Sequence, residues 1–154
     1  MQAEEGVVYS YRGRKLVYLP EDGGKGGEGE AEVLGLVIAG RFFRLGKPRV
    51  ADPALCRRCG ECCMSVSKVR ATPADIQRWI EEEREEVLSR LRITEREGVL
   101  VTDGTLRLGD SGCSFLEAGA GGYACRIHDT KPEVCAEYPL NVGGVCRAGV
   151  DFRR

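Results

Sequence analysis

The chain has 154 residues, a formal net charge of −1 and 31% charged residues. This length allows one domain, or one domain with a small appendage, around a modest hydrophobic core. The balanced charge gives no electrostatic reason to expect nucleic-acid binding, and the absence of any run of eighteen apolar residues predicts no membrane span. The acidic start, residues 1–5, lacks the apolar core of a secretory signal, so we expect a cytoplasmic protein with mostly reduced thiols.

The chain begins with β-rich sequence. Two apolar and aromatic runs within residues 7–19 flank Arg12-Gly13-Arg14, which predicts a β-hairpin with a short glycine-containing turn. Residues 21–30 are rich in glycine and acidic side chains. Because Lys25 is followed by glycine rather than by serine or threonine, this stretch favours a solvated loop over a phosphate-binding loop.

A second β-hairpin is predicted immediately afterwards. The apolar run over residues 33–38 has the length of a strand, and residues 41–45 provide a partner for it. Residues 1–50 contain neither cysteine nor histidine. Structural packing is therefore their expected role, and partner docking is the less favoured alternative. We therefore expect residues 1–50 to form a β-hairpin region, and residues 51–154 to form a separate cysteine-rich domain.

One long helix is predicted in the middle of the chain. Thr72 is a good N-cap, Pro73 suits the first helical position, and Asp75 lies where the positive end of the helix field favours a carboxylate. Apolar residues at helical spacing continue this pattern over residues 73–91. Trp79 lies on the apolar stripe, so we expect it in the core or covering a metal site.

Two further elements are predicted downstream. Asp103-Gly104 between β-rich runs favours a hairpin over residues 99–108. Residues 132–138 form a short helix in this interpretation, with proline at its start. Cys135 then lies in the first turn, where the helix field should stabilise a thiolate.

The eight cysteines carry the chemistry of the sequence. Cys56, Cys59 and Cys62 are separated by two residues each, and two-residue gaps allow a tight turn to aim two thiolates at one metal ion. Gly60, directly after Cys59, suits such a turn. Structural disulfides are the alternative interpretation. The candidate metal ligands are Cys56, Cys59, Cys62, Cys63, Cys113, Cys125, Cys135 and Cys146.

The cysteines and their neighbours resemble a known family, the YkgJ-type cysteine-cluster family. The matching motifs are Cys56-x-x-Cys59-x-x-Cys62-Cys63, Cys113-x-Phe115-Leu116 and Cys125-x-Ile127-His128-x-x-Lys131-Pro132-x-x-Cys135-x-x-Tyr138-Pro139. The resemblance covers residues 56–146 and implies a zinc- or iron-chelating domain. Many members of the family are labelled iron–sulfur proteins. A similar segment occurs in flagellin lysine methylases. His128 and Lys131 depart from the family, which more often has Tyr and Arg there.

Eight thiolates are compatible with several kinds of metal centre. They can hold two zinc ions, one [4Fe–4S] cluster with spare ligands, or two clusters. Cys62 and Cys63 are adjacent, so if locally extended they face opposite ways and can serve two centres. We favour an iron–sulfur cluster for electron transfer, or as part of a redox or modifying enzyme, over a zinc-stabilised interaction module without catalysis. His128 is expected to pack beside the cluster rather than to ligate it.

These patterns together predict an α+β fold with antiparallel β-hairpins, one long helix and a loop-rich cysteine cluster that metal stabilises. A redox protein partner is expected for the iron–sulfur interpretation. Neither a catalytic residue nor an oligomeric state follows from the sequence, and an iron–sulfur oxidoreductase is one enzyme class that it leaves open.

Overall fold

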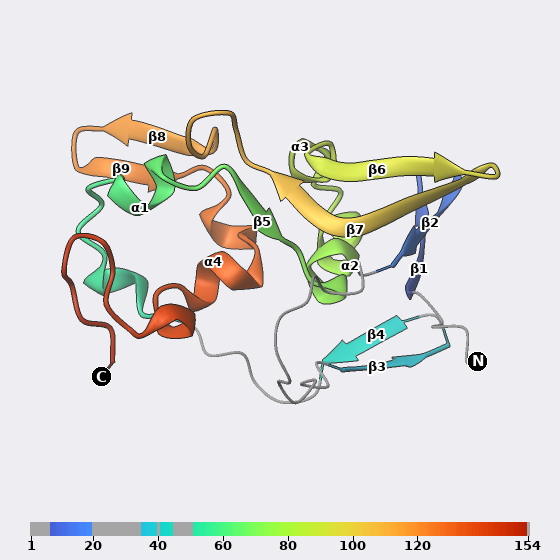
Figure 1. Ribbon diagram of the computed structural model, residues 1–154, viewed down its shortest axis with the longest axis horizontal. Coiled ribbons are helices and arrows are strands. Elements are labelled where there is room, and N and C mark those ends of the chain that lie inside the picture. Colours follow the sequence, from blue (N-terminus) through green and yellow to red (C-terminus); the bar gives the residue numbers. More distant parts are fainter. Residues whose placement is uncertain (1–6, 20–34, 40, 45–50, 154) are drawn as a thin grey trace, which may run out of the picture. The chain divides into compact units, whose positions relative to one another are not determined.

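The computed structural model has both strands and helices, as the predicted α+β class requires (Figure 1). It describes residues 7–19, 35–39, 41–44 and 51–153. Two compact units are present, and each draws on two segments of the chain. The first comprises Met1–Lys47 and Thr72–Thr105, and the second comprises Pro48–Ala71 and Leu106–Arg154. The domain boundary near residue 50 stays a prediction.

Both hairpins expected at the start of the chain are present in the first unit. Strands β1 (Val7–Tyr11) and β2 (Arg14–Tyr18) pair antiparallel, and their turn residues Arg12 and Gly13 have φ values of 51° and 70°. Two positive φ angles suit a two-residue turn whose twist matches that of the strands. Strands β3 (Gly35–Ile38) and β4 (Arg41–Arg44) also pair antiparallel. The glycine-rich stretch 21–30 lies outside the described residues.

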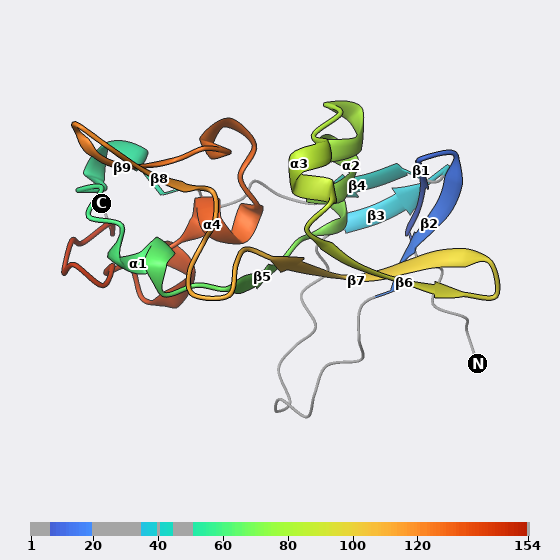
Figure 2. The ribbon, with the colours of Figure 1, turned by 90° about the horizontal axis from the view of Figure 1, so that it is seen from above.

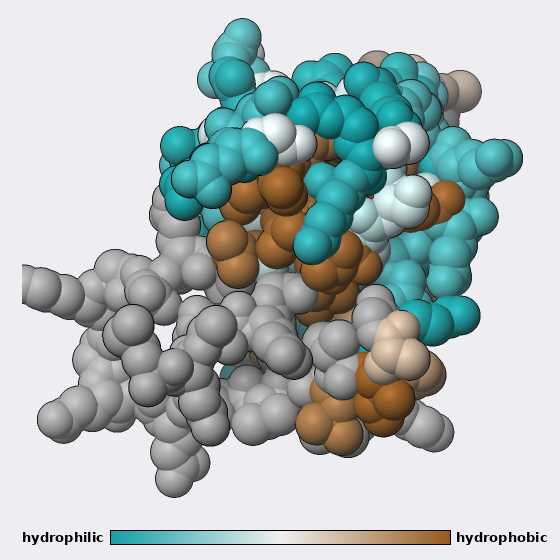
Figure 3. Space-filling model, turned by 90° about the vertical axis from the view of Figure 1, so that its right-hand side faces the viewer, coloured by the Kyte–Doolittle hydropathy of each residue, from teal (hydrophilic) through white to brown (hydrophobic). Residues whose placement is uncertain are grey.

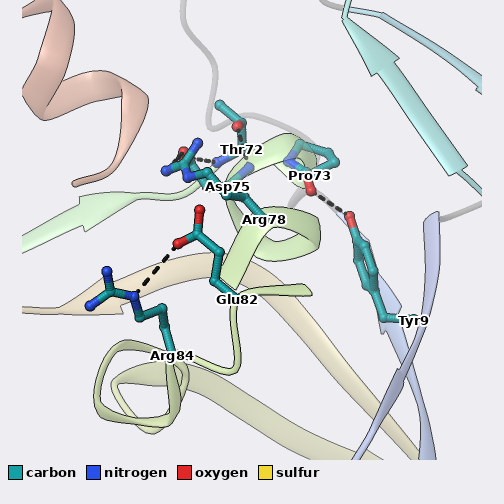
Figure 4. A network of polar contacts seen from close by, with 7 residues as sticks. All are labelled: Tyr9, Thr72, Pro73, Asp75, Arg78, Glu82 and Arg84. Carbon is teal, nitrogen blue, oxygen red and sulfur yellow. Dashed lines mark hydrogen bonds and ion pairs between the residues drawn. The ribbon is translucent and has the colours of Figure 1, made fainter. Parts of the chain in front are cut away.

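Helix α2 (Pro73–Glu81) begins where the capping pattern predicts (Figure 4). The Asp75 N–H donates to the Thr72 hydroxyl at 3.1 Å, and the Thr72 N–H donates to the Asp75 carboxylate at 2.9 Å. This reciprocal arrangement satisfies two backbone donors that a helix start leaves without partners. Asp75 is fully buried, and Arg78 compensates its charge at 3.0 Å. The buried Tyr9 hydroxyl donates to the Pro73 carbonyl at 2.7 Å, which ties β1 to the helix start.

The prediction of one long helix over residues 73–91 is wrong. Helix α2 ends at Glu81, Glu83 has a φ of 56°, and a separate single turn, α3 (Glu85–Leu88), follows before strand β6 (Leu91–Arg96). The acidic run from Glu81 to Glu86 explains the break. It places like charges three and four residues apart and supplies no apolar residue to hold a helix face. Trp79 is fully buried, so its predicted core role is confirmed.

The hairpin turn expected at Asp103-Gly104 is also misplaced. Strand β7 (Val99–Arg107) runs through both residues, and the turn that joins it to β6 is Glu97-Gly98, with φ values of 52° and 79°. Within β7, the Thr105 N–H donates to the Asp103 carboxylate at 2.8 Å. Side-chain bonding to the backbone thus lets the Asp-Gly pair remain within an irregular strand.

Strand β7 is the central strand of the larger sheet. The sheet order is β1-β2-β7-β5, with β6 also paired to β7, and β5 comprises Lys68–Arg70. The pairing of β2 with β7 is parallel, and Leu16 lies opposite Leu100. Strand β5 follows the segment that carries Cys56 to Cys63, and strand β7 precedes the segment that carries Cys113.

The first unit buries a hydrophobic core beside its helices. Its buried side chains include Leu16, Ile76, Trp79 and Val87. Figure 2 shows the β3–β4 hairpin running beside α2, and the two elements are in contact. Figure 3 shows hydrophobic side chains gathered on one face of the molecule. In the β3–β4 hairpin, Leu36, Ile38 and Phe43 are 50%, 59% and 49% exposed.

The second unit consists of short elements joined by irregular segments (Figures 1 and 2). They are η1 (Pro53–Leu55), α1 (Glu61–Met64), β5, β8 (Leu116–Gly119), β9 (Gly122–Cys125), η2 (His128–Thr130), α4 (Glu133–Glu137) and η3 (Leu140–Val142), together with the end of β7. The short helix predicted over 132–138 is therefore confirmed as α4. The buried core is small and centres on Phe115, Leu108, Ile127 and Phe152.

None of the helices in the described residues has the length and apolar character that a membrane span requires. A cytoplasmic location stays a prediction.

Candidate metal centre

The loop from Cys56 to Gly60 has the local geometry of a thiolate ligand loop. The backbone N–H of Arg58 donates to the Cys56 sulfur at 3.4 Å. Arg58 and Gly60 have positive φ values of 56° and 75°, so the chain turns sharply on both sides of Cys59. Glycine adopts such a φ without strain, as the sequence predicted for Gly60. Cys56 and Cys59 are both exposed.

This ligand loop is held against the tip of the β8–β9 hairpin. The Tyr123 N–H donates to the Arg58 carbonyl at 2.8 Å. A Cβ on Gly122 would lie 2.8 Å from the same carbonyl oxygen, and one on Gly60 would lie 2.7 Å from the Tyr123 ring. Contacts this close leave no room for a Cβ at either glycine, so Gly122 packs against the loop backbone and Gly60 packs against the Tyr123 ring.

A second backbone contact brings Cys63 and Cys113 together. The Cys113 N–H donates to the Cys63 carbonyl at 2.9 Å. Gly112, with a φ of 111°, lies so close to helix α1 that a Cβ there would be 2.6 Å from the Met64 carbonyl oxygen. The Leu116 N–H donates to the Cys113 carbonyl at 3.2 Å, and Leu116 pairs with Cys125 in the hairpin. Three thiol-bearing segments therefore meet at the open end of the hairpin.

The pKa values of these thiols report the same neighbourhood. Burial raises the pKa of Cys63 to about 11, and Cys113 and Cys125 add to the shift. Burial, followed by the charges of Cys113, Cys125 and Cys63, raises the pKa of Cys135 to about 12. The pKa of Cys125 is also raised, mainly by burial. Each thiolate therefore disfavours the others unless a cation lies among them.

The prediction of a helix-stabilised thiolate at Cys135 is wrong. Cys135 lies in α4 as expected, yet its pKa moves upward rather than downward. The helix has one turn, so its field is weak compared with desolvation and the like charge of neighbouring thiols.

Cys62 has a different neighbour from Cys63. Its sulfur lies 3.1 Å from the Tyr138 hydroxyl oxygen. Burial and the contact with Cys62 raise the pKa of Tyr138 to about 12, and Cys146 adds to the shift. Either the Cys62 thiol or the Tyr138 hydroxyl can be the donor in this contact.

All eight cysteines are free, so the disulfide interpretation has no support in this structure. Among the described residues, no three Cys, His, Asp or Glu side chains close onto a single point as a bound metal ion would require. The donor set nevertheless fits zinc or an iron–sulfur centre, because both prefer thiolate sulfur. His128 is exposed, and its expected position beside the cluster stays a prediction. The ligand roles of the individual cysteines stay predictions.

The fold and this cluster define a small α+β protein with a thiol-rich metal-binding domain. The chain belongs to the CxxCxxCC family, whose model, described as a "putative zinc- or iron-chelating domain", matches residues 55–149. The family that the sequence resembles is thereby confirmed, and metal binding is the class of function that it supports. No curated protein and no solved structure matches the chain.

Sequence reasoning identified the cysteines but missed residues that position them. Tyr138 stood out only as part of a family motif, and nothing in its spacing indicated a contact with Cys62, which is 76 residues away. Gly112 and Gly122 precede ligand-bearing segments, and a glycine at such a position is the available signal for close backbone approach.

Proposed function

We propose that this protein carries an iron–sulfur cluster, of the [4Fe–4S] type, for electron transfer or as part of a redox or modifying enzyme. The observation that carries the proposal is the exposed ligand loop, in which the Arg58 N–H donates to the Cys56 sulfur at 3.4 Å. Backbone N–H bonds to thiolate sulfur stabilise the electron-rich centre and tune its potential. When bound, such a cluster supplies reversible one-electron chemistry.

The exposure of the ligand loop also suits exchange of electrons with another protein. Cys56 and Cys59 both lie at the surface, and Arg57 and Arg58 beside them are exposed too. A redox partner with an acidic surface would find complementary charge there. The three-cysteine run with two-residue gaps is also the spacing of bacterial ferredoxins, which supports the same proposal.

A zinc-stabilised structural or interaction module is the second candidate. The tight turns at Arg58 and Gly60 favour it, because a Cys-x-x-Cys-Gly loop wraps a single tetrahedral ion equally well. The second unit has a small core, so a structural metal would have a clear stabilising role in either case.

The two candidates differ in redox activity. We expect protein purified anaerobically, then reconstituted with iron and sulfide, to be brown and to lose visible absorption on reduction with dithionite. Cys56→Ser should weaken this spectrum, whereas Ser65→Ala, in the neighbouring α1 segment but without a thiol, should not. A colourless wild-type protein that holds stoichiometric zinc and takes up no cluster would refute the redox proposal and leave the structural one.

A further inference from the structure

The first unit has an open groove where α3, strands β6 and β7 and the β1–β2 turn meet. Its volume is about 350 Å³, and its apolar side chains are those of Leu88, Leu91, Ile93 and Leu100. Leu88 and Leu91 are buried, whereas Ile93 and Leu100 are half-buried, so water reaches part of an apolar surface there. Small-molecule sites in proteins have volumes of roughly 300–1,000 Å³ and mostly apolar linings, so this groove is large enough for a small ligand.

Two arginines supply the charge of this groove. Arg12 and Arg14 line it, and none of the acidic residues that the structure describes does. Arg12 is paired with Glu85, and Arg14 is paired with Glu95 at 3.1 Å, but these two carboxylates lie outside the lining. Arg14 also donates to the Gly98 carbonyl at 3.2 Å, which holds its guanidinium beside the turn between β6 and β7. The groove thus combines an apolar floor with a positively charged rim.

Both guanidinium groups have hydrogen-bond donors for a further partner. Within the described part of the chain, the polar contacts of Arg12 and Arg14 all use Nη2. A guanidinium has five N–H donors in a planar fork that matches a carboxylate, so Nε and Nη1 remain for a ligand. Both ion pairs are exposed, and exposed pairs are weak, so a ligand carboxylate displaces them at small cost.

The volume and the existing charges define the ligand. A volume of about 350 Å³ corresponds to about a dozen water molecules at about 30 Å³ each, and hence to a molecule of about a dozen non-hydrogen atoms. Release of this water from the surface of Ile93 and Leu100 favours an apolar body. Each arginine already has a glutamate partner, so the rim favours a single added negative charge over a phosphate dianion.

We infer that this groove binds a small amphipathic anion, a monocarboxylate with an apolar chain of about ten carbons. Its carboxylate accepts hydrogen bonds from Arg12 and Arg14, and its chain lies over Ile93 and Leu100. The inference concerns the first unit alone and goes beyond the proposed metal-binding function, so it holds whether or not the cysteines carry metal.

Decanoate is the probe, because it has a carboxylate and about a dozen non-hydrogen atoms. Titrated into the full-length protein at concentrations below those at which it forms micelles, it should bind saturably in calorimetry. It should also shift the backbone amide NMR signals of Ser89, Ile93 and Leu100. Decanol has the chain without the charge and acetate has the charge without the chain, so each should bind at least about tenfold more weakly.

Variants separate the rim of the groove from its floor. Arg12→Gln combined with Arg14→Gln removes the charge of the rim, so decanoate affinity should fall by about tenfold. Arg92→Gln is the matched control, because Arg92 is an exposed arginine of β6 that does not line the groove, and it should leave the affinity unchanged. Ser89→Trp keeps both arginines but fills the groove from its edge, so it should block decanoate. Ser89→Trp decides if circular dichroism shows that the double variant is unfolded.

The inference is supported if decanoate shifts these amides and binds more weakly to the double variant and to Ser89→Trp, but not to Arg92→Gln. It is overturned if the amides of Ser89, Ile93 and Leu100 do not shift, or if decanol binds as tightly as decanoate. It is also overturned if Ser89→Trp binds decanoate as well as the wild type does, or if Arg92→Gln loses as much affinity as the double variant.

Discussion

Gly112→Ala tests whether close backbone approach builds the cysteine cluster. A Cβ at this position would lie 2.6 Å from the Met64 carbonyl oxygen and 3.0 Å from the Met64 carbonyl carbon and Cα. All three are backbone atoms of α1 or its end, so no flexible side chain can move aside. The substitution must push the segment before Cys113 away from the segment that carries Cys63, and their hydrogen bond of 2.9 Å must lengthen.

The expected loss of stability has two parts. A φ of 111° strains any residue with a Cβ, at a cost of about 1–3 kcal/mol, and the forced displacement adds about 1–3 kcal/mol. Gly143→Ala is a matched control in the same unit. Its φ is 104°, and a Cβ there would have no atom within 4 Å, so it carries the strain without the clash. The difference between the two variants therefore measures the contact with Met64.

Thermal unfolding of metal-loaded protein is the assay, with about 2–4 °C expected for each kcal/mol in a chain of this size. Gly112→Ala should unfold below Gly143→Ala and should also bind less cobalt(II), a probe of tetrahedral thiolate sites, because it displaces two candidate ligands, Cys63 and Cys113. Equal midpoints for the two variants, together with unchanged cobalt binding, would refute the view that this glycine positions Cys63 and Cys113.

Two further predictions concern tyrosine hydroxyl groups. Tyr138→Phe removes the 3.1 Å contact to the candidate ligand Cys62, so the cobalt(II) affinity of the reduced protein should fall by about 10–100-fold; a competition titration measures it, and unchanged affinity would contradict the contact. Burial raises the pKa of Tyr9 above its ordinary value of 10.0, and Tyr18 and Asp75 add to the shift. Because the folded state holds this proton more tightly than the unfolded state, stability is lost as the pH rises past about 10. Tyr9→Phe should lower stability at neutral pH by about 1–3 kcal/mol but show a smaller alkaline loss in urea unfolding, and equal alkaline losses would contradict this assignment.

Local interactions made part of the fold predictable. The turn at Arg12-Gly13 and the helix start at Thr72 depend on residues within four positions of each other, so the sequence pattern contains the whole interaction. The end of α2 was harder to predict, because no glycine or proline marks it and each like-charge pair in residues 81–86 weakens a helix by only about 0.2–0.5 kcal/mol. The turn at Glu97-Gly98 competes with the stronger Asp103-Gly104 pattern, and only pairing across the sheet decides between them.

The candidate site also has a local part that the sequence predicts and long-range contacts that it does not. The loop around Gly60 was predictable from the two-residue gaps between cysteines, since its geometry is local. The grouping of Cys63 with Cys113, and of Cys62 with Tyr138, joins residues 50 and 76 positions apart. Such contacts depend on how the hairpin and α1 pack, and spacing alone carries no information about them.

The packing around Cys63 also indicates why a metal would stabilise this unit. The partly buried thiols at the open end of the hairpin, those of Cys63, Cys113 and Cys125, gain little as neutral groups, because S–H is a weak hydrogen-bond donor. As thiolates they are disfavoured by burial and by mutual repulsion, and both causes raise the pKa values of Cys63 and Cys135. A bound cation reverses both effects, since it attracts the thiolates and cross-links segments that share only a small core. We therefore expect the order of this unit to depend on metal more than that of the first unit, whose core includes Trp79 and Ile76.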